Sequence, residues 1–165
     1  MTVHQLEPEE LLGVLQSHEV AFVIIGGFSL AAHGVVRGTK DIDIVPDASP
    51  ANLERLAGAL AALGATIDIG DIDAGELGVH LDRATLAAGG NFRLLTRFGA
   101  LDVMQDLPGM RGYASLRATA IEVPLTGVSG PLHFAGYDAL IAMKSAAARD
   151  QDVIDIADLR RARGD

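Results

Sequence analysis

The sequence has no cysteine and few aromatic residues, and both absences restrict what the chain can be. Without cysteine it can form no disulfide framework, thiolate zinc site or cysteine nucleophile, which fits a reducing compartment. Aromatic residues make up only 4% of the chain, although 49% of it is hydrophobic. A chain of this length can bury a sizeable core, and here that core must be aliphatic.

Long apolar runs are missing too, because glycine, histidine or charged residues interrupt them before they reach membrane-spanning length. The N-terminal segment MTVHQLEPEE is acidic, whereas a signal peptide begins with basic residues. The length of 165 residues suits one domain, residues 1–165. These features predict a cytoplasmic protein without a membrane partner.

Positive charge is scarce, with 13 Lys and Arg against 22 Asp and Glu and a formal net charge of −9. Such a chain repels phosphate backbones, so broad non-specific binding to nucleic acid is not expected. A local basic patch remains open, because the cations gather in the second half of the chain. They include Arg93, Arg97, Arg111, Arg117, Arg160, Arg161 and Arg163.

Hydrophobic patterning and turn residues predict a succession of short elements. Strands are expected at residues 20–25, 41–45, 65–69, 92–98, 100–105, 121–125 and 132–134. Helices are expected at residues 8–18, 28–33, 49–63, 137–149 and 153–163. This order predicts an α/β or α+β domain, with a mixed central sheet flanked by helices and two helices at the C-terminal side.

The stretch GGFSLAAHGVVRGTKDIDIV, residues 26–45, combines two signals. Gly26 and Gly27 follow an apolar strand and precede a helix, where a bare backbone can approach a phosphate. Ser29 adds a hydroxyl there. Asp41 and Asp43 then alternate with isoleucine, so they share one strand face and suit Mg²⁺. Read singly, the glycines could be an ordinary turn and the aspartates a solvated face.

Together, these signals resemble the DNA polymerase β-like nucleotidyltransferase superfamily, and in detail its AbiEii-type branch, which includes toxins of toxin–antitoxin pairs. The resemblance implies the nucleotidyltransferase fold. The residues that fit the motif are Gly26, Gly27, Ser29, Ala31, Arg37, Thr39, Asp41 and Asp43.

The resemblance also implies residues farther along the chain. A third carboxylate is expected on a later strand, and GALDVMQDLPG offers Asp102, with Asp106 less favoured because it lies in a turn. The segment LIAMKSAAARDQDVIDIADL is similar to the end of the family pattern. It supplies Lys144, Arg149, Asp152 and Asp155.

The implied activity is transfer of a nucleoside monophosphate from a nucleoside triphosphate (NTP) to an acceptor hydroxyl. Asp41, Asp43 and Asp102 would hold Mg²⁺, two ions in such sites, and Lys144 would complete the catalytic set. The nucleotide would lie against Gly26, Gly27, Ser29, Arg37 and Thr39. The acceptor stays open between tRNA, a protein and a small molecule, and an antitoxin is a further expected partner.

Several alternatives remain. The chain could be a non-catalytic member of the same fold that binds a nucleotide or a protein. Lys144 could be an ordinary lysine at a helix edge. Asp158 is better explained by a salt bridge to Arg160 or Arg161. An RNA acceptor would need a basic strip, which Arg93 and Arg97 would begin if they share a strand face.

Overall fold

The computed structural model describes residues 4–70 and 80–165. Within them, seven strands form one sheet in the order β3-β4-β5-β2-β1-β7-β6. β2 runs parallel to β5 and β1 runs parallel to β7, and the other pairs are antiparallel. The strands are β1 (Phe22–Ile25), β2 (Asp41–Pro46), β3 (Thr66–Ile67), β4 (Phe92–Thr96), β5 (Gly99–Val103), β6 (Ile121–Val123) and β7 (Leu132–Phe134).

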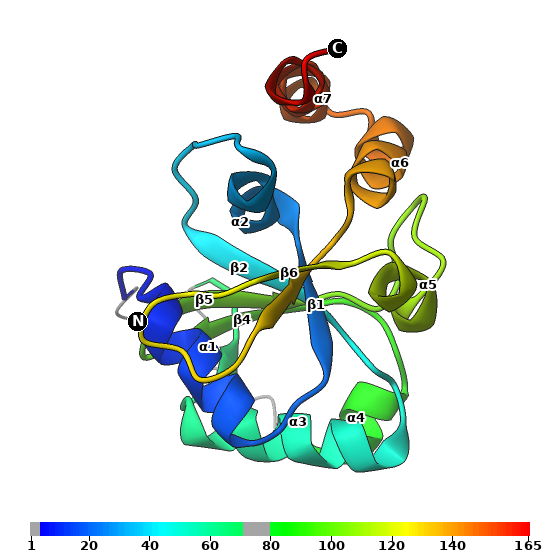
Figure 1. Cartoon of the computed structure of the whole chain (residues 1–165). Coiled ribbons are helices and arrows are strands. Elements are labelled where there is room, and N and C mark those ends of the chain that lie inside the picture. The colour runs from blue at the N-terminus through cyan, green and yellow to red at the C-terminus, as the bar shows by residue number, and fades with distance from the viewer. Residues whose placement is uncertain (1–3, 71–79) are drawn as a thin grey trace.

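Helices cover both faces of this sheet (Figure 1). α1, α3 and α4 lie on one face, and α2, α5 and α6 lie on the other, with α7 beyond α6. The predicted mixed sheet flanked by helices is therefore confirmed. The helices are α1 (Pro8–Ser17), α2 (Gly26–Leu30), the 3₁₀ helix η1 (Ala31–His33), α3 (Pro50–Ala62), α4 (Arg83–Ala87), α5 (Tyr113–Ala118), α6 (Tyr137–Ala147) and α7 (Asp150–Arg163).

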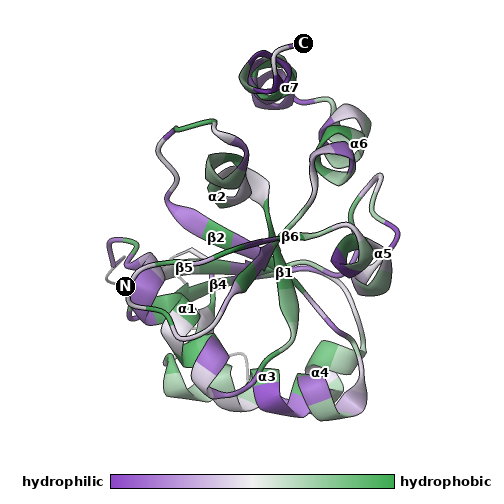
Figure 2. Cartoon of the chain, in the orientation of Figure 1, coloured by the Kyte–Doolittle hydropathy of each residue, from purple (hydrophilic) through white to green (hydrophobic). Residues whose placement is uncertain are grey.

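Local sequence explains the main elements. All four residues of β1 are buried, and Figure 2 shows this strand as a hydrophobic band through the centre of the sheet. α3 begins at Pro50 because the Ser49 side chain accepts a hydrogen bond from the Asn52 backbone N–H, and proline is favoured in the first helical turn. Burial thus fixes β1, which ends at the glycine pair, and capping fixes the start of α3, which follows β2.

The sheet separates two aliphatic cores, and β2 contributes to both. Ile42 and Ile44 pack with the leucines of α1 and α3, whereas Val45 packs with Leu30 of α2 and Leu140 of α6. Because strand side chains alternate, Asp41 and Asp43 face the side of the sheet opposite to Ile42 and Ile44. The second layer of helices therefore surrounds the aspartates.

Several elements differ from the sequence-based prediction. α4 and α5 were not predicted, because helices of five and six residues are too short to show a helical period. The strand predicted at 65–69 is reduced to Thr66–Ile67. The last helix begins at Asp150 rather than 153, because the Asp152 carboxylate accepts hydrogen bonds from the backbone N–H and the side chain of Arg149 at the helix start.

Candidate active site

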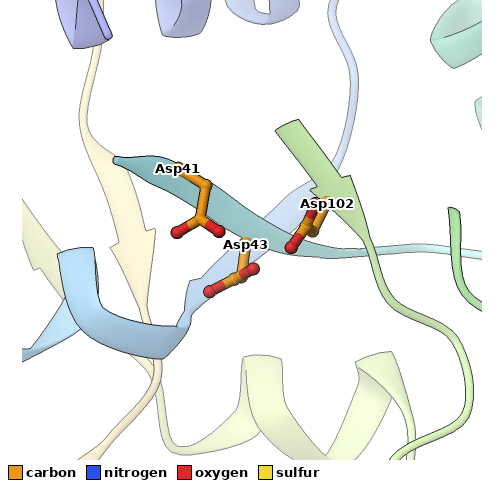
Figure 3. Close-up of side chains that lie close together, drawn as sticks. All are labelled: Asp41, Asp43 and Asp102. Atoms are coloured by element: carbon orange, nitrogen blue, oxygen red, sulfur yellow. The ribbon is translucent and has the colours of Figure 1, made fainter. Parts of the chain in front are cut away.

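Three carboxylates converge where β2 and β5 lie side by side. Asp43 is directly opposite Asp102 in the parallel register, and Asp41 lies two residues earlier on β2. One oxygen from each of the three lies within 4.8 Å of the other two. Figure 3 shows the carboxyl groups on the same side of the two strands. The sequence-based expectation that Asp102 faces Asp41 and Asp43 agrees with this geometry.

The triad, as we call Asp41, Asp43 and Asp102, is short of positive charge. Among the described residues, no lysine, arginine or histidine nitrogen comes within 4.0 Å of these oxygens. Burial, and then the charge of Asp41, raises the pKa of Asp43 to about 8. Burial also raises the pKa of Asp102, although a side-chain hydrogen bond with Asp43 and, to a smaller extent, the charge of Arg93 oppose this.

The donor set of the triad fits a divalent cation. Hard carboxylate oxygens on rigid neighbouring strands are ligands that Mg²⁺ takes readily, and a cation would relieve the mutual repulsion that raises the pKa of Asp43. We therefore assign Asp41, Asp43 and Asp102 as the residues able to hold such an ion.

The glycine pair lies directly beside the triad. Gly26 has φ +70°, which favours glycine, and a Cβ on it would overlap the Asp43 carboxylate. A Cβ on Gly27 would lie 3.0 Å from Nη2 of Arg37 and 3.5 Å from Oγ1 of Thr39. Gly26 is thus required by close approach, whereas a Cβ on Gly27 would need the end of the Arg37 side chain to shift, and the pair brings bare backbone to the edge of the triad.

Ser29 has a different place from the one that the sequence suggested. Its side chain is fully buried, and Oγ donates a hydrogen bond of 2.6 Å to the Gly26 carbonyl. With its one proton used there, the hydroxyl shapes the glycine turn and is not presented to a phosphate.

A cavity of about 560 Å³ joins these features. The triad, both glycines, Arg37 and Thr39 line it, together with Lys144 of α6 and residues of α7. Thr39 donates through Oγ1 to the backbone oxygen of Asp41 at 2.9 Å, so it orients the first aspartate of β2. Except for Ser29, every residue expected at the site therefore lines one cavity.

The opposite wall of the cavity carries cations that are already paired. Lys144 is buried, and Nζ lies 2.8 Å from Asp155 and 3.6 Å from Asp152. Arg37 lies 3.2 Å from Asp155, and Arg149 lies 2.8 Å from Asp152. Lys144 is therefore not the exposed lysine of the alternative interpretation.

The same ion pairs and hydrogen bonds set the pKa values of the two aspartates on this wall, Asp152 and Asp155. Burial alone would raise the pKa of both aspartates. Hydrogen bonds from Arg149 nevertheless lower the pKa of Asp152, and hydrogen bonds from Lys144 and Gln151 lower that of Asp155. Both carboxyls are held in the charged form.

The basic strip expected for an RNA acceptor does not form. Arg93 lines the cavity, but Arg97, Arg111 and Arg117 do not. β4 ends at Thr96, whose hydroxyl donates to the Gly99 carbonyl and closes the turn, so the strand alternation stops before Arg97. Arg97 instead lies near Gly64. The expected shared face was therefore wrong.

Two further residues line the cavity, and two of the aspartates considered from the sequence lie outside it. Lys40 and Gln151 line the cavity and were not selected, because nothing in their spacing distinguishes them. Asp106 is exposed, and its backbone bonds to Asn91. The half-buried Asp158 pairs with Arg161 at 2.8 Å, which confirms the salt bridge expected for it.

Solved structures with the same fold are nucleotidyltransferases. The lincosamide antibiotic adenylyltransferase LnuA, with lincomycin bound, matches with a TM-score of 0.63 and 17% identity over 96% of this chain and 99% of that chain. ANT(2″)-Ia, in complex with adenylyl-2″-tobramycin, matches with a TM-score of 0.57 and 15% identity over 92% and 84%. At these identities the likeness shows the nucleotidyltransferase fold.

Two other comparisons complete the picture. No protein-family model matches the sequence, and no curated protein matches it. In the described part of the chain, no helix has both the length and the apolar character needed to cross a membrane.

Proposed function

We propose that this chain is a divalent-metal-dependent nucleotidyltransferase that moves a nucleoside monophosphate from an NTP to a hydroxyl of a small molecule. The observation that carries the proposal is the triad, one buried and two half-buried carboxylates that form no salt bridge with any described residue, beside a glycine turn and a cationic wall in one cavity. The fold shared with adenylyltransferases supports the same reaction class.

In the reaction, the acceptor hydroxyl oxygen attacks the α-phosphorus of the NTP. A new oxygen–phosphorus bond forms while the bond from the α-phosphorus to the bridging oxygen breaks, and pyrophosphate leaves with that electron pair. The hydroxyl proton passes to Asp102, the buried carboxylate of the triad, which lies directly opposite Asp43. Divalent metal ions at the triad would neutralise phosphate charge and lower the pKa of the hydroxyl.

The remaining residues bind and orient. The bare backbone at Gly26 and Gly27 admits the phosphates to the edge of the triad. Arg37 and Lys144 supply positive charge from the opposite wall. Such reactions depend mainly on positioning and on electrostatic stabilisation, which are the contributions these residues can make.

Charge supports a small acceptor over RNA. Five cations line the cavity, namely Arg37, Lys40, Arg93, Lys144 and Arg149, and five aspartates balance them, namely Asp41, Asp43, Asp102, Asp152 and Asp155. Divalent ions at the triad would offset the negative charge that the NTP brings, so no positive surplus is left for a second polyanion. LnuA and ANT(2″)-Ia are described with lincomycin and adenylyl-2″-tobramycin, which are antibiotics.

The test is label transfer by the purified full chain. Each α-labelled NTP is incubated with Mg²⁺ or Mn²⁺ and with lincomycin, tobramycin, a polyol panel or tRNA, and pyrophosphate release is measured. We expect release that depends on metal and on a small-molecule acceptor, and none in EDTA or with Asp43→Asn. NTP binding without release under every condition would instead support a non-catalytic member, and labelled tRNA would refute the small acceptor.

The AbiEii-type toxin interpretation and its antitoxin stay predictions with a separate test. If the chain is a toxin, induced expression arrests growth, and Asp43→Asn relieves the arrest at equal protein level. Normal growth with active, soluble wild-type protein would contradict the toxin role and leave the transferase intact.

A further inference from the structure

Asp155 lies where three segments meet. Its Oδ2 accepts hydrogen bonds from Nζ of Lys144 on α6 at 2.8 Å and from Nη2 of Arg37 at 3.2 Å. Its Oδ1 accepts from Nε2 of Gln151 at 2.9 Å. The carboxylate is only 1% exposed. One buried oxygen on α7 thus holds two cations that come from segments about a hundred residues apart.

Both cations keep unused donors in the cavity. A guanidinium has five N–H groups and an ammonium has three. Arg37 gives one N–H to Asp155, and its guanidinium also lies against Gly27, where a Cβ would be 3.0 Å away. Lys144 gives one N–H to Asp155, with Asp152 at 3.6 Å. The remaining donors belong to residues that line the same cavity as the glycine turn.

We propose that Asp155 is a positioning residue, which fixes Arg37 and Lys144 beside the Gly26–Gly27 turn so that both cations meet the phosphates of the incoming nucleotide. The nucleotide as ligand rests on the proposed function. Long cationic side chains lose much rotamer freedom when they bind, and a carboxylate that holds them in advance removes that loss from nucleotide binding.

A purely structural role would differ in what it affects. If Asp155 only neutralised a buried lysine, its loss would lower stability and reduce the amount of folded protein, and the folded fraction would bind nucleotide normally. If it positions the two cations, folded protein should bind triphosphate more weakly. The readout must therefore be affinity per folded molecule.

The first experiment compares Asp155→Asn with Asp158→Asn by calorimetric titration with Mg²⁺–tripolyphosphate and with each Mg²⁺–NTP. Asp158 is a matched control, because it lies on the same helix and pairs with Arg161 at 2.8 Å outside the cavity. We expect Asp155→Asn to weaken binding about tenfold or more, as loss of charge-assisted hydrogen bonds does, and Asp158→Asn to match wild type. Equal affinity of the two variants overturns the proposal.

The second experiment asks whether Asp155 acts through Arg37. In an Arg37→Gln background, Asp155→Asn should weaken tripolyphosphate binding by a clearly smaller factor than in wild type. Equal factors in the two backgrounds would overturn action through Arg37. If Asp155→Asn fails to fold, Asp155→Glu keeps the charge but displaces both cations, and wild-type affinity of that variant would refute the positioning role.

Measuring triphosphate binding and nucleotidyl transfer separately distinguishes a failure of this inference from a failure of the proposed function. A wild-type chain that binds triphosphate but releases no pyrophosphate contradicts the transferase, while the affinities still test Asp155. A chain that transfers normally and shows unchanged affinity with Asp155→Asn contradicts only the inference. A wild-type chain that binds no triphosphate overturns both.

Discussion

Two groups of buried aspartates face each other across one cavity, and their pKa values move in opposite directions. The pKa of Asp43 in the triad rises to about 8, whereas the pKa values of Asp152 and Asp155 fall. Burial acts in the same direction on all of them. The difference is that α6, α7 and the segment before β2 bring cations into direct contact with Asp152 and Asp155, whereas among the described residues the triad has only the more distant charge of Arg93.

This comparison distinguishes carboxylates whose charge is paired within the chain from carboxylates whose charge is not. The aspartates of α7 are satisfied within the chain, so they organise the cavity wall. The carboxylates of the triad repel one another, and either a proton on Asp43 or a bound cation offsets this repulsion. Four predictions test the difference, in order of expected effect.

Asp43→Asn should lower the rate of transfer at least about 10³-fold, equivalent to about 4 kcal/mol of transition-state stabilisation, because it removes a metal ligand. Steady-state pyrophosphate release measures this. Asp106→Asn is the matched control, since Asp106 is an exposed aspartate after β5, the strand that carries Asp102, and it should keep wild-type activity. Comparable losses in both variants would contradict the assignment of the triad.

Asp155→Asn should lower the free energy of unfolding by about 3 kcal/mol at pH 7, because Lys144 and Arg37 lose a buried partner. The pKa of Asp155 is lowered in the folded state, so this stabilisation exists above the unfolded pKa and is lost as pH falls through the folded value. Urea unfolding of wild type and Asp155→Asn should show a difference in the free energy of unfolding that is smaller at pH 3 than at pH 7. A difference in the free energy of unfolding that stays constant with pH would argue against a charged Asp155.

Without metal, the triad should give the opposite pH dependence. The folded pKa of Asp43 is raised, so stability present below the unfolded value near 3.8 is lost as pH rises toward 8. We expect a loss of about 2 kcal/mol, discounted for partial solvation. Thermal melts in EDTA from pH 5 to pH 9 should show this slope in wild type and a flatter one in Asp43→Asn. Added Mg²⁺ should restore the melting temperature of wild type at pH 8.

Ala148→Gly should have the smallest effect, because it should change protein stability at the end of α6 and leave the triad unaffected. Ala148 caps α6 with φ 52°, a left-handed conformation that disfavours alanine. Glycine there should raise stability by about 0.5 kcal/mol. The Mg²⁺ concentration at half-maximal activity should not change, since the triad lies on other elements. A changed metal dependence would show that wall and triad are coupled.

Much of the fold and of the site could be predicted, because the decisive signals are local. The apolar run before Gly26, the alternation around Asp41 and Asp43, and the helix start at Ser49 each depend on neighbouring residues. The convergence of Asp102 with Asp43 needed more, since it depends on a parallel pairing across about sixty residues. The resemblance supplied that link, whereas composition alone did not.

What could not be predicted depends on tertiary contacts. The Ser29 hydroxyl turns back to Gly26, and the end of β4 at Thr96 removes Arg97 from the site. The two cations on Asp155 come from an earlier loop and a neighbouring helix. Spacing along the sequence could suggest that Asp152 and Asp155 share a helix face, but not which side chains would meet them.

The position of β1 in the sheet has a consequence for synthesis of the protein. β1 pairs with β2 on one side and with β7 on the other, and β7 is made about 110 residues later. On the ribosome, the sheet β3-β4-β5-β2-β1 can form first, with the apolar strand FVII as its open edge. Such an edge invites pairing between chains. A nascent chain stalled before residue 132 should therefore aggregate. In the complete chain β7 pairs with β1 and covers this edge.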